Sequence, residues 1–258
     1  MPSKKTLGLV LSGGGYRGPA HVGVLQALEE HKIKPDYISG TSAGAIVGAL
    51  YASGCSISKI MEFWEKESLF QFSFFTFAKP GLVDTEKMAD ILTKYIEVET
   101  FEQLKCKLFV AATDIINAKV RFFNEGPLIR PIIASASFPL VFTPTEHDGN
   151  FFLDGGIVNN FPLEPIKLFC DVSLGVNISP MRTNIGVKDL DGYLEVIQRV
   201  YELGSDADTQ SKMILCDFLI CPHELTEYGT FDRGNVEKIF EIGYNYANKI
   251  IDKLKAKL

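Results

Sequence analysis

The chain has 258 residues, of which 46% are hydrophobic and 22% charged, a composition typical of a folded globular protein that excludes a disordered or collagen-like chain. Its 26 Lys and Arg against 32 Asp and Glu give a net charge of −6, which opposes attraction to a phosphate backbone, so we expect no nucleic-acid partner. This length suffices for a large hydrophobic core, and we predict a single domain over residues 1–258.

The first fifty residues predict a βαβα arrangement. Thr6 to Leu11 reads as a buried strand, and Ala20 to His31 carries a helical stripe of apolar residues after a glycine loop. Tyr37 to Ser39 reads as a second strand, and Ala43 to Ala52 as a helix of small residues. Such alternation is typical of an α/β fold, here a three-layer α/β/α domain with a mainly parallel central sheet.

The later elements continue this alternation without a linker or an internal repeat. Asp148-Gly149 indicates a hairpin turn between Phe142-Thr143 and a strand at Phe151 to Leu153 that delivers Asp154 to its end. The remaining predicted helices cover residues 86–95, 190–209 and 236–258, and the remaining strands cover residues 108–114, 119–123, 171–178 and 217–221.

An aromatic segment from Met61 to Val83 allows two interpretations. Its residues Phe63 and Trp64 and the Phe70 to Phe77 stretch fit ordinary core packing. An exposed apolar lid or a surface that contacts lipid is the alternative.

Five scattered cysteines without a CxxC pair indicate reduced, buried thiols and a cytoplasmic protein. The short apolar run before Gly13 does not make a signal peptide, and no stretch reaches the roughly 18 apolar residues of a membrane span. Four histidines lack ligand spacing, so we expect neither a metal nor another cofactor. The sequence gives no indication of oligomeric state.

Gly40-Thr41-Ser42-Ala43-Gly44 is a GxSxG pattern between a predicted strand and a predicted helix. Flanking glycines permit a strained turn that exposes the Ser42 hydroxyl, and the helix N-terminus favours the negative charge that develops during acyl transfer. Ser42 is therefore a candidate nucleophile. The alternative is a helix-capping serine between closely packed glycines.

The loop from Gly13 to Gly18 joins the first strand to the first helix and offers unobstructed amides. A phosphate cradle for a nucleotide is one interpretation, but the loop lacks a GKS or GKT ending and the spacing of a dinucleotide fingerprint. An oxyanion hole formed by Gly13, Gly14 and Gly15 is the better interpretation, because loop and serine both follow strand ends. Arg17 supports the loop, binds a phosphate, or is a surface arginine.

Asp154-Gly155-Gly156 supplies the stronger candidate for the general base, since the acid ends a strand and two glycines let the backbone approach another loop. A simple Asx-turn is the alternative. Among the histidines only His223 follows in the Ser, Asp, His order of α/β-hydrolases, and a solvated or capping role suits it better.

Together these motifs resemble the patatin-like phospholipase family, in its single-domain bacterial form. The resemblance covers about residues 6–180, and the segment Leu140 to Pro144 departs from the family's second proline-rich stretch, which affects the expected shape of the acyl channel. It rests on four features in order, namely Gly13 to Gly18, Gly40 to Gly44, the Ala134 to Pro139 run ASASFP, and Asp154-Gly155-Gly156 followed by Asn159-Asn160-Phe161-Pro162.

The resemblance implies a Ser42–Asp154 dyad that works without histidine, an oxyanion hole at Gly13 to Gly15, and supporting roles for the other motif residues. Arg17, Gly18, Gly40, Gly44, Gly155 and Gly156 make up this supporting set. It implies a lipid ester substrate, in particular a phospholipid, and a transient contact with a membrane surface. A general carboxylesterase or acyltransferase, or a non-catalytic lipid- or phosphate-binding protein, are the alternatives.

Overall fold

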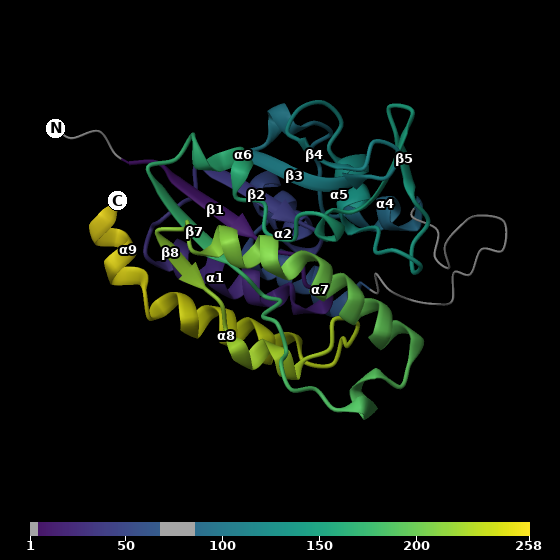
Figure 1. The fold of residues 1–258 in the computed structure, drawn as a ribbon. Helices are drawn as coiled ribbons and strands as arrows, with labels where there is room; N and C mark the ends of the chain where they lie inside the picture. Colours follow the sequence, from purple (N-terminus) through teal and green to yellow (C-terminus); the bar gives the residue numbers. More distant parts are fainter. Residues whose placement is uncertain (1–4, 68–85) are drawn as a thin grey trace.

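The computed structural model describes residues 5–67 and 86–258, and these ranges contain an eight-stranded sheet with helices on both of its faces (Figure 1). The strands follow the order β5-β6-β3-β2-β1-β7-β8, and β4 pairs with β3 beside that path. Their bounds are β1 (Leu7–Leu11), β2 (Tyr37–Thr41), β3 (Lys107–Asp114), β4 (Lys119–Phe123), β5 (Thr145–His147), β6 (Asn150–Asp154), β7 (Val172–Val176) and β8 (Phe218–Ile220).

The helices of the described chain cover the two faces of the sheet (Figure 1). The α-helices are α1 (Pro19–Glu30), α2 (Ala43–Ser53), α3 (Ile57–Lys66), α4 (Glu86–Thr93), α5 (Ile129–Ala136), α6 (Glu164–Lys167), α7 (Tyr193–Met213), α8 (Val236–Asn248) and α9 (Ile251–Lys257). Short 3-10 helices include η1 (Gly15–Arg17), η4 (Gly155–Ile157), η5 (Val187–Leu190) and η6 (His223–Glu227).

Strand β1 shows why the fold has three layers. Its residues Leu7, Leu9 and Leu11 belong to the larger hydrophobic cluster, which includes residues of α1 and α2. Val10 points to the other face and joins a smaller cluster with Ile166 of α6. A strand buried on both faces carries a continuous apolar run, and the predicted α/β/α class is confirmed.

The sheet is parallel at its centre and antiparallel at one side. Strands β3, β2, β1, β7 and β8 run parallel, whereas β6 and β4 are antiparallel to β3. Thr41 pairs with Ala111 and the next residue of β3, Ala112, pairs with Asp154. The end of β6 thereby meets the end of β2, although the two strands approach from opposite directions.

The predicted hairpin is present, with Asp148 and Gly149 at φ values of 50° and 73° between β5 and β6. Both positive φ values match the type I′ turn that such a dipeptide favours. Strand β5 begins at Thr145, two residues after the predicted Phe142-Thr143 segment, which precedes the strand instead of forming it.

Three predicted helices differ from the observed ones by two or more residues at an end, and the described chain contains three further α-helices that the sequence pattern does not predict. The last helix is two helices, because Ile250 N–H bonds to Ala247 O in a tight turn between α8 and α9. Helix α7 runs later than the predicted 190–209, and α4 ends at Thr93. The unpredicted helices are α3, α5 and α6, each of which is too short to show a long periodic pattern.

Phe63 and Trp64 are fully buried, which supports core packing for the start of the aromatic segment. Its Phe70 to Phe77 stretch lies outside the described residues. The five cysteines form no disulfide, and burial raises the pKa of the Cys106 and Cys216 thiols to about 12. Across residues 5–67 and 86–258, no helix is both long and apolar enough to cross a membrane.

Candidate active site

Ser42 occupies a strained turn between β2 and α2. Its φ of 53° and ψ of −120° lie outside the conformations that a serine prefers, and its amide donates to Ser135 Oγ at 2.9 Å. Ser135 Oγ donates in turn to Ala111 O at 2.6 Å, so one hydroxyl ties the turn to β3. This geometry is that of a nucleophile elbow.

The two glycines of the GxSxG motif allow the elbow to pack closely. A Cβ on Gly44 would lie 2.2 Å from Leu11 O of β1, and one on Gly40 would lie 2.6 Å from the Gly44 carbonyl. Both contacts involve backbone atoms that cannot move aside. Glycine at these positions therefore serves close approach of the backbone.

Asp154 lies at the end of β6 with only 1% of its surface exposed. Its Oδ1 accepts a hydrogen bond from the Gly156 amide at 2.9 Å, and the Ser42 side chain lies close enough to the carboxylate to favour its charged form. Burial raises the pKa of Asp154 to about 6, and the hydrogen bonds to its charged form oppose this rise. The Asp154 amide donates to Ser137 O, so the ASASFP run holds both Ser42 and Asp154.

The glycine loop brings two backbone amides, for which the described residues provide no acceptor, to the cavity that contains Ser42. Gly13 N–H donates to Asn160 O at 3.2 Å, whereas the amides of Gly14 and Gly15 donate to no described residue. Gly14 and Gly15 line the cavity that holds Ser42, and Gly15 has a φ of 57° that favours glycine. The available donors are therefore two of the three predicted.

Arg17 is a buried residue that braces this loop from behind. Its Nε donates to Tyr228 O at 2.8 Å, and Nη1 lies 3.5 Å from Ser179 Oγ. Burial lowers the pKa of Arg17, and the nearby Glu202 carboxylate opposes that effect. Next to it, a Cβ on Gly18 would lie 2.2 Å from the Trp64 ring, so glycine lets the loop pack against α3.

The glycines after Asp154 also mark close contacts. A Cβ on Gly155 would lie 2.3 Å from Ala111 O, and one on Gly156 would lie 1.9 Å from the Tyr201 hydroxyl. Tyr201 is a residue of α7, far along the chain from the motif. The structure thus brings a helix from the C-terminal part of the chain onto the DGG motif.

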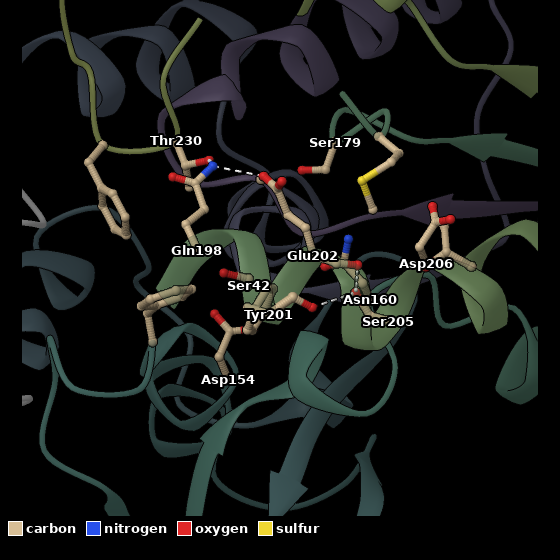
Figure 2. A pocket seen from close by; sticks show the side chains of 16 residues that line it. Ser42, Asp154, Asn160, Ser179, Gln198, Tyr201, Glu202, Ser205, Asp206 and Thr230 are labelled. Carbon is tan, nitrogen blue, oxygen red and sulfur yellow. Dashed lines mark hydrogen bonds between the residues drawn. The ribbon is translucent and has the colours of Figure 1, made fainter. Parts of the chain in front are cut away.

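Ser42 and Asp154 open into a cavity of about 610 Å³, including its mouth. Figure 2 shows Ser42, Asp154 and Tyr201 together in it, with Gln198, Glu202, Ser205 and Asp206 on α7 beside them. The full lining is Gly14, Gly15, Ser42, Phe138, Asp154, Asn160, Ser179, Met181, Gln198, Tyr201, Glu202, Ser205, Asp206, Thr209, Thr230 and Phe231.

None of the described residues that line this cavity is a histidine. His21 lies behind the glycine loop, where its Nε2 is 2.9 Å from Ser12 O and burial lowers its pKa to about 4. His223 begins the 3-10 helix η6 and is not among the residues that line the cavity. No group of three or more His, Cys, Asp or Glu in the described part of the chain is arranged to hold a metal ion.

Three residues of the site carry roles that the sequence did not predict. The Ser135 hydroxyl accepts a hydrogen bond from the Ser42 amide, and the Asn160 carbonyl accepts one from the Gly13 amide. The Tyr201 hydroxyl donates a hydrogen bond to Asp154. Ser135 and Asn160 lie in the ASASFP and NNFP runs, which mark the family resemblance but indicate no role for either residue. Tyr201 had no motif, and its helical position resembles that of any half-buried aromatic.

This arrangement places a hydroxyl beside a buried carboxylate and two unoccupied amides at one cavity wall. A hydroxyl next to an acceptor can lose its proton as it attacks a carbonyl carbon. Backbone amides at the same site can stabilise the resulting oxyanion. The chemistry that these groups fit is acyl transfer.

Sequence comparison finds relatives among fungal and mycobacterial proteins. "Lysophospholipase nte1" of Neurospora crassa is 26% identical over 280 residues, which cover 97% of this chain and 18% of that protein. An "Uncharacterized NTE family protein" of Mycobacterium tuberculosis is 35% identical over 185 residues, which cover 69% of this chain and 50% of that protein. The chain thus spans about a fifth of the fungal relative and half of the mycobacterial one.

The fold has a counterpart among solved structures. The crystal structure of VipD from Legionella pneumophila matches 97% of this chain and 67% of its own with a TM-score of 0.55 at 15% identity, a likeness of fold. The sequence model of the family described as "Patatin-like phospholipase" matches residues 9–167, which include the glycine loop, the Ser42 elbow and the Asp154 motif. By that match, which spans more than half of its length, the chain belongs to the patatin-like phospholipase family.

Proposed function

We propose that this protein is a serine acyl hydrolase that cleaves carboxylic esters of phospholipids, lysophospholipids included, through a Ser42–Asp154 dyad. The observation that carries the proposal is the position of the Ser42 side chain next to the buried Asp154 carboxylate, whose pKa it lowers, at the wall of one cavity. A Ser42 that only capped α2 would need no such partner, and its side chain makes no capping bond.

In the proposed reaction Ser42 Oγ attacks the carbonyl carbon of the ester while its proton passes to Asp154. The carbonyl oxygen becomes an oxyanion that the Gly14 and Gly15 amides stabilise, since the Gly13 amide is already engaged. The intermediate collapses as Asp154 returns the proton to the leaving alcohol oxygen. Water then attacks the acyl-enzyme while Asp154 accepts its proton, and the second tetrahedral intermediate collapses as Asp154 passes that proton to Ser42 Oγ, which releases the fatty acid and restores Ser42 and the Asp154 carboxylate.

The environment of Asp154 suits a general base at neutral pH. A carboxylate in water, with its pKa near 3.9, accepts a proton poorly at pH 7. Burial raises the pKa of Asp154 to about 6, which makes it a stronger base that is still mostly ionised at pH 7. Turnover should therefore fall as the pH drops through about 6 and Asp154 becomes protonated.

The lipid substrate is supported by family membership and by the cavity. Phe138, Met181 and Phe231 contribute apolar lining suited to an acyl chain, while Glu202 and Asp206 contribute polar groups suited to a head group. A fungal relative is named a lysophospholipase. Because such substrates reside in membranes or micelles, the proposal includes a transient contact with a lipid surface.

The first test is covalent labelling of Ser42 by a fluorophosphonate together with hydrolysis of a short p-nitrophenyl ester. Ser42→Ala should abolish labelling, and Ser42→Ala and Asp154→Asn should each lower turnover by about 10³-fold or more, because each removes one member of the dyad. His223→Ala serves as the control and should keep wild-type turnover. Loss of activity in the His223 variant with a mild effect in the Asp154 variant would contradict the dyad.

The second test addresses the substrate by a lipid panel analysed by mass spectrometry. Phospholipids, lysophospholipids, triacylglycerols and short esters are compared, with Ser42→Ala as the blank. We expect release of fatty acid from phospholipids or lysophospholipids. Activity confined to short esters would identify a general carboxylesterase and leave the dyad intact.

A further inference from the structure

Helix α7 brings a phenol hydroxyl to the carboxylate of Asp154. Tyr201 Oη donates to Asp154 Oδ1 at 2.8 Å, and the Gly156 amide donates to the same oxygen at 2.9 Å. Two donors from different directions fix the rotation of a carboxylate, because each lone pair of Oδ1 takes one of them. Figure 2 shows Tyr201 beside Ser42 and Asp154.

The phenol ring is itself held in place by its neighbours. Its centroid lies 5.0 Å from that of Phe138, which in turn meets the Phe231 ring edge-on at 5.3 Å. On the other side its hydroxyl lies over Gly156, where a Cβ would come within 1.9 Å of it. The hydroxyl therefore has room at Asp154 only because the second glycine of the DGG motif has no side chain.

Tyr201 acts as a donor and not as a proton acceptor. Burial raises its pKa well above the usual value, and the neighbouring Asp154 charge raises it further, so the phenol keeps its proton. A donor to the carboxylate stabilises the charged form of Asp154 and lowers its pKa, against the effect of burial. The other titratable groups that line the cavity are Glu202 and Asp206, both on α7.

We propose that Tyr201 is a positioning residue of the dyad, whose hydroxyl fixes the Asp154 carboxylate through Oδ1 and keeps it ionised, leaving Oδ2 to take the proton of Ser42. The inference rests on the proposed function and extends it, because α7 lies outside the residues that the family model matches. By this proposal, helix α7 in the C-terminal part of the chain orients the general base Asp154 directly.

The experiment compares Tyr201→Phe, which removes the hydroxyl and keeps the ring, with wild type. Tyr193→Phe is the matched control, since Tyr193 is on the same helix with 73% of its surface exposed. The carboxyl titration of Asp154 is followed by ¹³C NMR in protein labelled with [4-¹³C]aspartate, with the signal assigned by its loss in Asp154→Asn. Turnover of a p-nitrophenyl ester is measured over the same pH range.

We expect Tyr201→Phe to raise the midpoint of the Asp154 titration by about 1 pH unit and to move the acid limb of kcat by the same amount. At optimal pH, kcat should fall about 10-fold or more while KM changes little, because the hydroxyl orients the base without binding substrate. Tyr193→Phe should leave the titration, kcat and KM unchanged. Replacing Tyr201 by a fluorotyrosine, a more acidic donor, should move the midpoint the opposite way.

An unchanged Asp154 titration in Tyr201→Phe would overturn the inference. So would a fall in kcat with the acid limb unmoved, since a purely structural role gives that pattern. If Tyr201→Phe does not fold, the fluorotyrosine protein decides, and an unmoved midpoint there also overturns the inference. Absence of Ser42 labelling would instead refute the proposed function, while the NMR titration still tests the Tyr201 bond without any turnover.

Discussion

The Ser135 hydroxyl links the strained backbone of the candidate nucleophile to strand β3. It accepts from the Ser42 amide at 2.9 Å and donates to Ala111 O at 2.6 Å, and its side chain is fully buried. A positive φ at a serine persists only when the surrounding contacts enforce it. The alignment of Ser42 Oγ therefore depends on a neighbour that is not among the residues lining the cavity.

We expect Ser135→Ala to lower the free energy of unfolding by about 1–3 kcal/mol, because the Ser42 amide and Ala111 carbonyl lose their partner in a buried place. Turnover of a p-nitrophenyl ester should fall about 10-fold or more as the elbow relaxes. Urea unfolding and ester kinetics check the two effects.

Ser137→Ala is the matched control for Ser135→Ala. The Ser137 hydroxyl bonds to Ile133 O and Thr145, while the Ser137 carbonyl, which receives the Asp154 amide, is kept in the variant. This control should lose stability with turnover nearly unchanged. An equal loss of turnover in both variants would show that the Ser135 bond has no special effect on the elbow.

The identities of Ser42, Asp154 and the glycines could be predicted from sequence because each lies in a short motif whose spacing has a local physical reason. The contacts of Ser135 and Tyr201 could not. Tyr201 reaches Asp154 across 47 positions of the chain, and nothing in the local pattern of α7 distinguishes a donor to a carboxylate from a packed aromatic. The engagement of the Gly13 amide by Asn160 likewise depends on tertiary contact.

At the scale of elements, two glycines set the distance between α1 and α8, which lie side by side (Figure 1). A Cβ on Gly23 would lie 2.1 Å from Phe240 O, and one on Gly243 would lie 1.9 Å from Ala20 O. Each glycine thus faces backbone of the opposite helix. Helix α1 starts directly after the glycine loop, so this packing also supports the loop that carries Gly14 and Gly15.

We expect Gly243→Ala to lower the free energy of unfolding by about 1–3 kcal/mol because the added methyl forces the two helices apart. Alanine alone would favour a helix by about 1 kcal/mol over glycine. Gly204→Ala in α7 provides the control, because a Cβ at this position would meet nothing within 4 Å. This substitution should raise the free energy of unfolding by about 1 kcal/mol. Urea unfolding measures both, and a stabilising Gly243→Ala would disprove the close packing.

The parallel centre of the sheet could be predicted because the first βαβα unit is written in local patterns of apolar residues and glycine. The direction of β6 could not, since its pairing with β3 joins residues about forty positions apart. That pairing decides the site: β3 continues past the end of β2, and the extension receives Asp154 next to the elbow. The hairpin turn predicted only that Asp154 would end a strand.

At the scale of the whole molecule, the residues beyond the family match complete the cavity and the core. Helix α7 forms a wall with Tyr201, Glu202 and Ser205, and α8 covers α1. Strand β8 extends the sheet beside β7. We therefore propose that the chain folds as one domain, in which unfolding exposes the dyad and the C-terminal helices in a single cooperative transition.

The buried charge of Asp154 should lower the free energy of unfolding of the protein. An acid whose folded pKa is raised binds protons more tightly when folded, so stability falls as the pH rises between the unfolded and the folded pKa and stays reduced above both. For Asp154 this window runs from 3.8 to about 6, a difference that corresponds to about 3 kcal/mol at pH 8. Asparagine at this position cannot ionise and escapes that cost.

We therefore expect Asp154→Asn to be inactive yet more stable than wild type at pH 8, by up to about 3 kcal/mol, with this advantage reduced by roughly half at pH 5. Urea unfolding of both proteins at the two pH values measures it. Because asparagine's own effects on packing are the same at both pH values, the change of the difference with pH isolates the titration of Asp154. An advantage that does not shrink between pH 8 and pH 5 would mean that Asp154 titrates as an ordinary carboxyl, and the buried base would lose its physical basis.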